Sequence, residues 1–369
     1  MTPRPNPATF VMTGGGTGGH VIPAIAVARE LRSRGHNVRF IGTQRGIEAK
    51  LVPAADFPIE WIVIGGLNRV GFLKTMESLA ELPLSVWQAS RMLDRAKPTA
   101  LFSMGGYVAG PVLLAALWKK IPVVVMEPNA IPGFTHRKLA RFVARALISF
   151  SETARWFPAR CTEVTGLPVR DKFFEIPQKP RGPVITILIT GGSQGSRTLN
   201  RAAEESWLLW AGATKGVSIR LIHQTGPKPF EELSAKFRAA KVDGEIHPFL
   251  SDMPAAFAEA DIIVSRAGAG AVSELAAAGK PSILIPLPTA SDNHQFRNAQ
   301  AMEQAGASRL VTDMDWTGQR FVSEVLSLLD EPGRLEKMST AARTFAKPDA
   351  ARRAADVLES LLVSRGTSS

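Results

Sequence analysis

With 369 residues, 45% of them hydrophobic, and a formal net charge of +11, the chain is long enough for about two globular domains. Its single cysteine, Cys161, excludes an intramolecular disulfide and a cysteine-rich zinc site. The longest apolar run has 11 residues, at 108–118, against the roughly 20 that a transmembrane helix needs. Because the N-terminus also lacks the apolar stretch of a signal peptide, we expect neither a transmembrane helix nor a signal peptide.

The positive charge is concentrated in the first half of the chain. Residues 1–168 contain 20 Lys and Arg against 10 Asp and Glu, whereas residues 169–369 contain 24 against 23. A basic half favours an anionic partner, for which nucleic acid and a membrane surface are the usual candidates.

The first half alternates β-rich runs with helical segments. Strands are predicted at residues 9–13, 38–42, 100–103, 123–126 and 146–149, and helices at residues 21–34, 79–95, 111–119 and 135–143. This alternation favours a parallel sheet that is covered on both faces.

The second half begins the same pattern again. Strands are predicted at residues 184–190, 219–223, 262–265 and 283–285, with a helix from Leu199 after the first of them. Each half therefore opens with a strand, a glycine loop and a helix, which predicts an α/β fold of two doubly wound, Rossmann-like domains. The expected domains are 8–168, joined by a returning helix at about 348–364, and 169–347, with the linker in 168–183.

The first glycine loop, GGGTGGH at residues 14–20, is typical of an anion site. Glycines let the backbone approach a phosphate, and the following helix presents its N-terminus. The G-x-G-x-x-G spacing also occurs in dinucleotide-binding domains, but the second strand is followed by Thr43-Gln44-Arg45 and not by a ribose-binding acid. Neither glycine loop continues into Gly-Lys-Ser/Thr, which excludes a Walker A loop.

His20 ends this loop at the start of a helix. The helix dipole disfavours an imidazolium there, so we expect a neutral ring that accepts a proton. One interpretation is that this histidine merely hydrogen-bonds its own loop. The surrounding glycines instead favour a role as a general base.

Two polar segments of the second half are typical of sugar-nucleotide contacts. Glu274 follows a strand and a small-residue turn at 261–271, where a carboxylate can accept both ribose hydroxyls or merely complement the helix dipole. The polar run at 292–298 follows the next strand, and suits sugar hydroxyls or a solvated helix start.

Seven ordered motifs carry a resemblance to a known family. They are GGGTGGHVIPAIAVA (14–28), SMGGYVAGP (103–111), EPNAIPG (127–133), GLPVR (166–170), TGGSQGSRTLN (190–200), SRAGAGAVSE (265–274) and DNHQFRNA (292–299). The sequence resembles the MurG family, the UDP-N-acetylglucosamine transferases of bacterial peptidoglycan synthesis, over residues 8–362. The resemblance implies a GT-B fold and an inverting transfer of N-acetylglucosamine to the muramyl C4 hydroxyl of lipid I. The products are lipid II and UDP, made at the cytoplasmic face of the cell membrane.

The resemblance also implies a set of site residues. His20 is the expected base, and the expected acceptor contacts are Gly15, Gly16, His20 and Tyr107. The expected contacts of the donor sugar nucleotide are Thr17, Gly18, Gly19, Asn129, Arg170, Ser193, Gln194, Leu250, Ala269, Glu274, His294 and Gln295. Within that set Glu274 holds the ribose, Leu250 lines the uracil pocket, and Ser193, Gln194 and Arg170 contact the diphosphate. Thr17 is also expected on the acceptor side.

Four residues depart from the family pattern. Met126 and Pro128 replace a His and a Gln beside Asn129, Leu167 replaces an Asn, and Ala271 replaces a Thr. We expect these changes to retune the site without abolishing it.

No tightly bound cofactor is expected, and no motif requires a divalent cation. Asp313-Met314-Asp315 forms a D-x-D sequence, which binds metals in other transferases. Since it precedes a helix and lies far along the chain from the other motifs, it is interpreted as a helix cap.

A basic and apolar segment at 67–97 suits docking on anionic lipid, or is a core helix with a charged face. Its residues are Val70, Phe72, Leu73, Leu84 and Trp87, with Arg69, Lys74, Arg91, Arg95 and Lys97.

Two other functions are considered. A different GT-B enzyme of UDP-N-acetylglucosamine, such as a 2-epimerase or a soluble-acceptor transferase, is the closer one. A nucleic-acid-binding protein lacks support, because no recognition motif is present.

Overall fold

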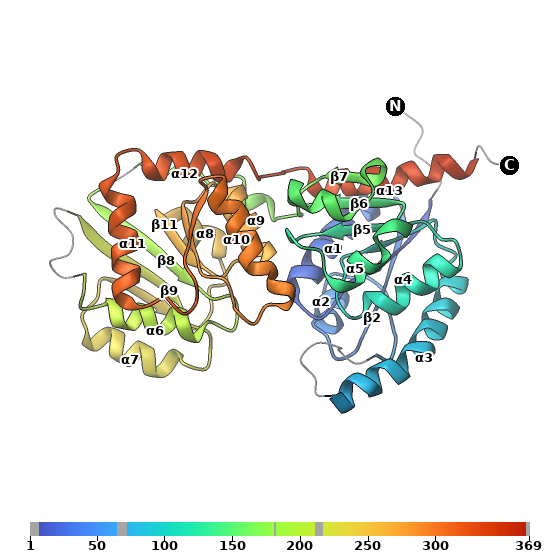
Figure 1. The fold of residues 1–369 in the computed structure, drawn as a ribbon, viewed down its shortest axis with the longest axis horizontal. Coiled ribbons are helices and arrows are strands. Elements are labelled where there is room, and N and C mark those ends of the chain that lie inside the picture. Colours follow the sequence, from blue (N-terminus) through green and yellow to red (C-terminus); the bar gives the residue numbers. More distant parts are fainter. Residues whose placement is uncertain (1–6, 65–71, 181, 211–216, 367–369) are drawn as a thin grey trace. The chain divides into compact units, whose positions relative to one another are not determined.

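The computed structural model describes the chain outside residues 1–6, 65–71, 181, 211–216 and 367–369 (Figure 1). The chain divides into two compact units. Unit 1 comprises Met1–Val169 and Asp349–Ser369, and unit 2 comprises Arg170–Pro348.

Unit 1 is built on a seven-stranded parallel sheet with the order β3-β2-β1-β4-β5-β6-β7. Its strands are β1 (Thr9–Thr13), β2 (Asn37–Gly42), β3 (Ile59–Trp61), β4 (Ala100–Ser103), β5 (Val123–Glu127), β6 (Arg145–Ile148) and β7 (Thr162–Val164). Its helices are α1 (Gly18–Ser33), α2 (Glu48–Ala54), α3 (Phe72–Ala96), α4 (Ala109–Trp118), α5 (Phe134–Leu139) and α13 (Ala350–Gly366). Short 3-10 turns follow α5 (Ala140–Phe142) and β6 (Ser151–Trp156), and another (Ala159–Cys161) directly precedes β7.

Unit 2 repeats this plan with a six-stranded parallel sheet in the order β10-β9-β8-β11-β12-β13. Its strands are β8 (Val184–Thr190), β9 (Ser218–Gln224), β10 (Gly244–His247), β11 (Ile262–Ser265), β12 (Ser282–Leu284) and β13 (Ser308–Leu310). Its helices are α6 (Arg197–Ser206), α7 (Phe230–Ala239), α8 (Met253–Glu259), α9 (Ala269–Ala278), α10 (His294–Gln304), α11 (Gly318–Asp330) and α12 (Arg334–Arg343).

The central strands are apolar on both faces, as a sheet covered on both sides requires. Every residue of β4, β5 and β11 is buried. In each sheet the strand order reverses beside the first strand, between β1 and β4 in unit 1 and between β8 and β11 in unit 2. Ligands of doubly wound sheets bind beyond the carboxyl ends of the strands at such a point. The predicted α/β class is correct.

The strands that sequence analysis misses are the four edge strands β3, β7, β10 and β13. They have only three or four residues, most of them half-buried, and so lack an apolar run. The predicted start of the first helix is also late, since α1 begins at Gly18 and not at Val21.

The segment expected to be a linker is packed into unit 2 after its first residues. A 3-10 turn at Asp171–Phe173 contacts α8 and α9. The Phe173 ring is fully buried and lies 5.0 Å from the ring of Phe257. The expectation of a linker is therefore wrong for this part of the segment.

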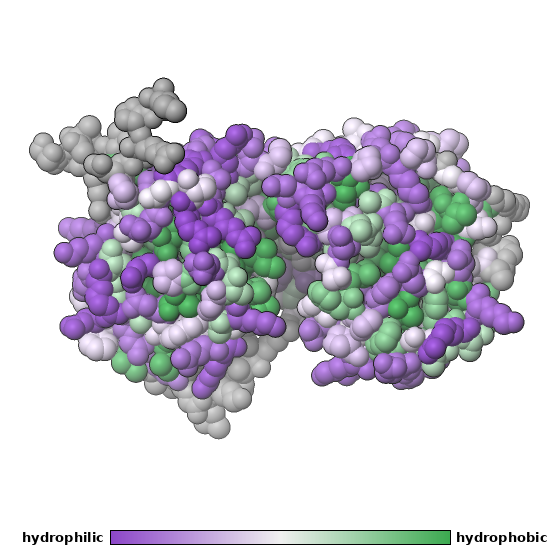
Figure 2. Space-filling model, turned by 180° about the vertical axis from the view of Figure 1, so that it is seen from behind, coloured by the Kyte–Doolittle hydropathy of each residue, from purple (hydrophilic) through white to green (hydrophobic). Residues whose placement is uncertain are grey.

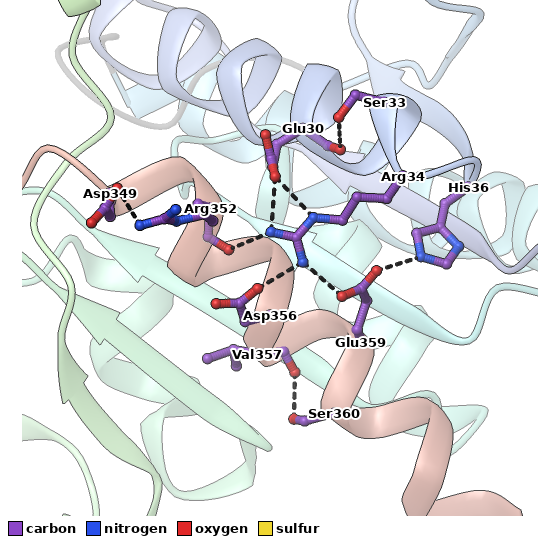
Figure 3. A network of polar contacts seen from close by, with 10 residues as sticks. All are labelled: Glu30, Ser33, Arg34, His36, Asp349, Arg352, Asp356, Val357, Glu359 and Ser360. Atoms are coloured by element: carbon purple, nitrogen blue, oxygen red, sulfur yellow. Dashed lines mark hydrogen bonds and ion pairs between the residues drawn. The ribbon is translucent and has the colours of Figure 1, made fainter. Parts of the chain in front are cut away.

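Helix α13 lies against α1, and a polar network joins them (Figure 3). Arg34 at the end of α1 donates to Asp356 at 2.7 Å and to Glu359 at 2.6 Å. His36 also contacts Glu359, at 2.8 Å, while its Nδ1 accepts the backbone N–H of Ala8. These contacts tie the last helix to the start of the chain within unit 1.

On the face drawn in Figure 2, hydrophilic side chains cover most of the surface of each unit, with smaller hydrophobic areas among them. Among the helices in the described part of the chain, none combines the length and the apolar character needed to cross a bilayer.

Candidate active site

The first glycine loop lies at the carboxyl edge of the unit 1 sheet, beside the loop that follows β4. The two loops are joined where the N–H of Met104 donates to the carbonyl of Thr13 at 2.9 Å. The Tyr107 ring lies so close to Gly16 that a Cβ atom there would be 3.0 Å from its Cε1. The fold thus brings the predicted acceptor residues Gly15, Gly16 and Tyr107 together at one edge.

His20 is the third residue of α1 and is half-buried. Its Nδ1 lies 3.1 Å from the hydroxyl oxygen of Thr17, the N-cap residue of the helix. The backbone N–H of His20 donates to the carbonyl of Thr17 as well. The contact to the Thr17 hydroxyl therefore orients the imidazole, while the backbone bond fixes the first turn of the helix.

An acid does lie at the end of the second strand, although the residues next to that strand contain none. Glu48 folds back at the start of α2, and its carboxylate accepts from the N–H groups of Gly16 and Thr43. Glu48 is only 1% exposed, so it faces the loop and not a ribose. The dinucleotide interpretation fails for this reason as well.

A buried carboxylate also organises the loop after β5. Glu127 accepts from both the backbone and the side-chain amide of Asn129, and from the N–H of Gly133. Burial favours the neutral acid, but the hydrogen bond and charge of His136, with the backbone donors, hold the pKa of Glu127 below its ordinary value. Asn129 is thereby fixed in place, next to the unusual residue Pro128.

In unit 2 the second glycine loop, residues 191–196, joins β8 to α6. Ser193 and Gln194 are exposed on it, and Ser196 caps the helix by accepting the N–H of Leu199. Gln224 at the end of β9 donates to the carbonyl of Gly192 at 2.9 Å and accepts the N–H of Leu250 at 2.8 Å. Gln224, which sequence analysis does not single out, thus links the predicted uracil segment to the loop.

Glu274 and Arg170 form an ion pair, with 3.2 Å between Oε1 and Nη2. Burial raises the pKa of Glu274 above its ordinary value, while the charge and the hydrogen bond of Arg170 oppose that shift. The Arg170 guanidinium also lies 4.8 Å from the centre of the Phe173 ring. The residue predicted for the ribose and one predicted for the diphosphate therefore bind each other in this structure.

The other predicted unit 2 residues lie at the starts of α9 and α10. Ala269 is the first residue of α9. Gln295 accepts the N–H of Leu287, and His294 contacts the carbonyl of Ser291 at 2.7 Å. Just before them Asp292 and Asn293 have φ of 51° and 55°, and non-glycine residues in that region are often found at functional sites.

Arg266 connects four segments at this edge of the sheet. Its guanidinium donates to Ser196 at 2.7 Å, to the carbonyls of Ile285 and Pro286, and to the carboxylate of Asp313. Asp313 also accepts from Thr198 at 3.0 Å. The interpretation of Asp313 as a remote helix cap is wrong, because it contacts two of the motifs and the N-cap of α11 is Thr317.

Comparison with known proteins agrees with this architecture. The glycosyltransferase family 28 N-terminal domain matches residues 10–148, and the C-terminal domain of that family matches residues 186–354. A UDP-N-acetylglucosamine–N-acetylmuramyl-(pentapeptide) pyrophosphoryl-undecaprenol N-acetylglucosamine transferase of Solibacter usitatus is 59% identical over 352 residues, covering 95% of this chain and 96% of the relative. The chain belongs to glycosyltransferase family 28.

Further relatives and solved structures agree with this assignment. The enzyme of the same name from Myxococcus xanthus is 38% identical, covering 96% of this chain and 93% of its own. The crystal structure of MurG from Acinetobacter baumannii has a TM-score of 0.80 and 32% identity, covering 96% of this chain and all of that one. A UDP-GlcNAc 2-epimerase from Neisseria meningitidis, with a TM-score of 0.64, 16% identity and coverage of 96% and 99%, shares the fold only. The resemblance to the MurG family and the GT-B class predicted from sequence are confirmed.

The structure divides the predicted site residues of this family 28 chain between its units. Unit 1 holds Gly15, Gly16, Thr17, Gly18, Gly19, His20, Tyr107 and Asn129, and unit 2 holds Arg170, Ser193, Gln194, Leu250, Ala269, Glu274, His294 and Gln295. Sequence analysis does not assign Glu48, Gln224 and Arg266. Arg266 lies inside a quoted motif, whereas nothing in the sequence marks the other two.

Proposed function

We propose that the chain transfers N-acetylglucosamine from UDP-N-acetylglucosamine to the muramyl C4 hydroxyl of lipid I, giving lipid II and UDP. The observation that carries this proposal is the 59% identity to the Solibacter usitatus transferase over 95% of the chain. The two segments matched by family 28 domains, residues 10–148 and 186–354, contain both glycine loops. Peptidoglycan synthesis is then the process in which the chain acts.

The reaction exchanges one bond at the anomeric carbon. The C4 oxygen of the acceptor forms a bond to C1 of the sugar, the bond from C1 to the diphosphate oxygen breaks with its electron pair going to UDP, and the C4 proton passes to a base. Attack opposite the leaving group inverts the α linkage to β. A base and a stabiliser of the leaving charge are required.

His20 is the proposed base. In the neutral tautomer with the proton on Nδ1, the ring donates to the Thr17 oxygen 3.1 Å away and presents the Nε2 lone pair to the acceptor proton. Thr17 then has a positioning role that its place on the helix N-cap allows. Gly15, Gly16 and Tyr107 accompany His20 on the acceptor side of the proposal.

The proposed site for the diphosphate is the second glycine loop. Its exposed residues Ser193 and Gln194 precede the N-terminus of α6, where amide dipoles favour a negative charge. Arg170 is proposed to leave Glu274 and turn to the diphosphate when the sugar nucleotide binds. Glu274 is then available to the ribose hydroxyls, with Leu250 beside the uracil and His294 and Gln295 at the sugar.

These groups supply the leaving charge with stabilisation that requires no tightly bound cation. Arg170 and the α6 dipole support this part of the proposal, and Asp313 is already engaged by Arg266 and Thr198. We expect transfer to continue in EDTA.

A membrane surface is the proposed place of action, on its cytoplasmic side. Leu84 and Trp87 of α3 are 48% and 58% exposed, while Ala89 and Leu93 on the same helix are buried. The Arg91 guanidinium lies 5.8 Å from the centre of the Trp87 ring. Trp118, at the end of α4 and beside two lysines, is 76% exposed.

Part of the segment predicted to dock lies outside the described residues. This part comprises Arg69 and Val70, and the side chains of Phe72, Leu73 and Lys74.

The proposed function is tested by measuring UDP release from UDP-N-acetylglucosamine with and without a lipid I analogue. Acceptor-dependent release and a product heavier by one N-acetylglucosamine unit are expected, in EDTA as in buffer. Release that ignores the acceptor, or formation of an epimerised sugar nucleotide, would overturn the proposal.

A further inference from the structure

A buried carboxylate lies beneath the first glycine loop. Glu48, at the start of α2, is 1% exposed and accepts three hydrogen bonds. Its Oε2 accepts the Gly16 N–H at 3.0 Å, and its Oε1 accepts the N–H of Thr43 at 3.2 Å and the Thr43 hydroxyl at 2.8 Å. The carboxylate thus joins the loop after β1 to the end of β2.

Glycines are needed to make room for this carboxylate. A Cβ atom on Gly15 would lie 2.5 Å from Oε1 of Glu48, and one on Gly46 would overlap Oε2. No real Cβ atom makes contacts that short. Part of the glycine content of this region is therefore explained by a carboxylate belonging to the chain, before any ligand phosphate is considered.

The carboxylate also places a negative charge against the loop. Within the described residues, no Lys, Arg or His forms an ion pair with Glu48, and its three partners are N–H and O–H groups of Gly16 and Thr43. All three partners are hydrogen-bond donors, as the acceptor oxygens of a carboxylate require. The carboxylate occupies the Gly16 N–H, so this amide does not donate to a ligand in this structure.

The same carboxylate sets the direction of a hydrogen bond to Tyr107. The Thr43 hydroxyl has one proton, which it gives to Glu48 at 2.8 Å. The contact of 3.1 Å between the Thr43 and Tyr107 hydroxyl oxygens must then run from Tyr107 to Thr43. The Tyr107 oxygen is left with lone pairs, so it can accept a hydrogen bond from a substrate hydroxyl.

We propose that Glu48 is a positioning residue for the acceptor. Its carboxylate holds the first glycine loop by the Gly16 amide and, through Thr43, makes the Tyr107 hydroxyl a hydrogen-bond acceptor. This inference rests on the proposed function, because it assigns the unit 1 loop to the lipid-linked acceptor.

The substitution Glu48→Gln tests the proposal with little change in shape. An amide has one oxygen, so whichever way it is turned its NH2 group faces a backbone N–H of Gly16 or Thr43 that needs an acceptor. Leaving such a buried donor unsatisfied costs enough to displace the loop. We expect the KM for a lipid I analogue to rise about tenfold or more, which corresponds to about 1.4 kcal/mol. The KM for UDP-N-acetylglucosamine should rise much less, since most of its proposed binding residues belong to unit 2 and are not touched.

A second pair of variants separates the Tyr107 link from folding. Thr43→Val removes the hydroxyl but keeps the shape, and is expected to raise the acceptor KM severalfold. Thr43→Ser keeps the hydroxyl and is expected to restore an acceptor KM near that of the natural chain. Should Glu48→Gln fail to fold, this pair decides: a Thr43→Val variant with an unchanged acceptor KM overturns the inference.

The control is Glu152→Gln, which neutralises an exposed glutamate of the same unit. It should leave both KM values unchanged. A folded Glu48→Gln variant with the acceptor KM of the natural chain, or with both KM values raised equally, contradicts the role of Glu48. If the natural chain itself shows no acceptor-dependent release of UDP, the proposed function fails instead, so the two failures are distinct.

Discussion

Arg266 and Asp313, 47 residues apart in the chain, form an ion pair at the carboxyl edge of the unit 2 sheet. The guanidinium extends from this pair to Ser196, the N-cap of the helix that follows the second glycine loop. The side chains of Arg266 and Asp313 are 13% and 20% exposed. Asp313 therefore stabilises the proposed diphosphate loop indirectly, because it pairs with the Arg266 guanidinium. Without Asp313 that charge would be nearly buried and unpaired.

Asp313→Ala is expected to lower the free energy of unfolding by about 2–4 kcal/mol, somewhat less than loss of one partner costs in a fully buried pair. The KM for UDP-N-acetylglucosamine should rise severalfold in the folded variant, because Ser196 loses a fixed partner. Denaturant unfolding and steady-state kinetics measure the two effects. Asp315→Ala is the matched control, since Asp315 is exposed and bonds Thr312. Equal effects of both substitutions, with a requirement for a divalent cation, would instead indicate a metal site at the D-x-D sequence.

His20→Ala is expected to lower kcat by roughly 10² to 10⁴, the usual contribution of a general base. Both KM values should change little, because the ring is proposed to act on the proton and not to hold either substrate tightly. Thr17→Val should give a smaller loss, since it removes only the partner 3.1 Å from Nδ1. Initial rates at saturating substrates provide the measurement. A His20→Ala variant with nearly normal turnover would exclude the base role.

The buried His223 makes stability depend on pH. Burial lowers its pKa to about 3, whereas the unfolded residue has a pKa of about 6.5. Below pH 6.5 the unfolded chain binds a proton that the folded chain does not, so stability falls by about 1.4 kcal/mol per pH unit down to about pH 3. His223→Gln should remove about 2 kcal/mol of the loss between pH 6.5 and 4.5.

Denaturant unfolding of the full chain at several pH values measures this slope. His247→Gln provides the control, because that imidazole is 34% exposed on the neighbouring strand β10. The assignment fails if the His223→Gln variant loses stability with pH as steeply as the natural chain.

The proposed membrane surface predicts that binding to vesicles containing anionic lipid decreases with salt. Arg91→Glu removes one positive charge and adds a negative one, so binding should weaken roughly thirtyfold at about 1 kcal/mol per charge. Trp118→Ser should also weaken it, while Leu208→Ser, at an equally exposed position of unit 2, should not. Vesicle sedimentation measures the partitioning. Unchanged binding of the Arg91→Glu variant would restrict α3 to a role in the core.

The central part of both sheets follows directly from the sequence. Strands such as β4 and β11 are buried on both faces, so they must be continuous apolar runs, and such runs are visible without a structure. The glycine loops can also be recognised in the sequence, because a position where the backbone lies close to another group accepts only glycine or another small residue. Family membership follows from the motifs that these loops contain.

Tertiary structure decides what the sequence leaves open. The edge strands β3, β7, β10 and β13 exist because a neighbouring strand pairs with them, and their own residues carry little signal. Glu48 and Asp313 acquire their roles from partners that the fold brings to them, 32 residues away at Gly16 and 47 residues away at Arg266. Spacing in the sequence predicts which side chains lie together on one helix or strand. The burial of a charged side chain, in contrast, depends on every segment that the fold packs around it. The first glycine loop is therefore recognisable from its residues, but only the fold shows that a carboxylate of the chain already occupies one of its amides.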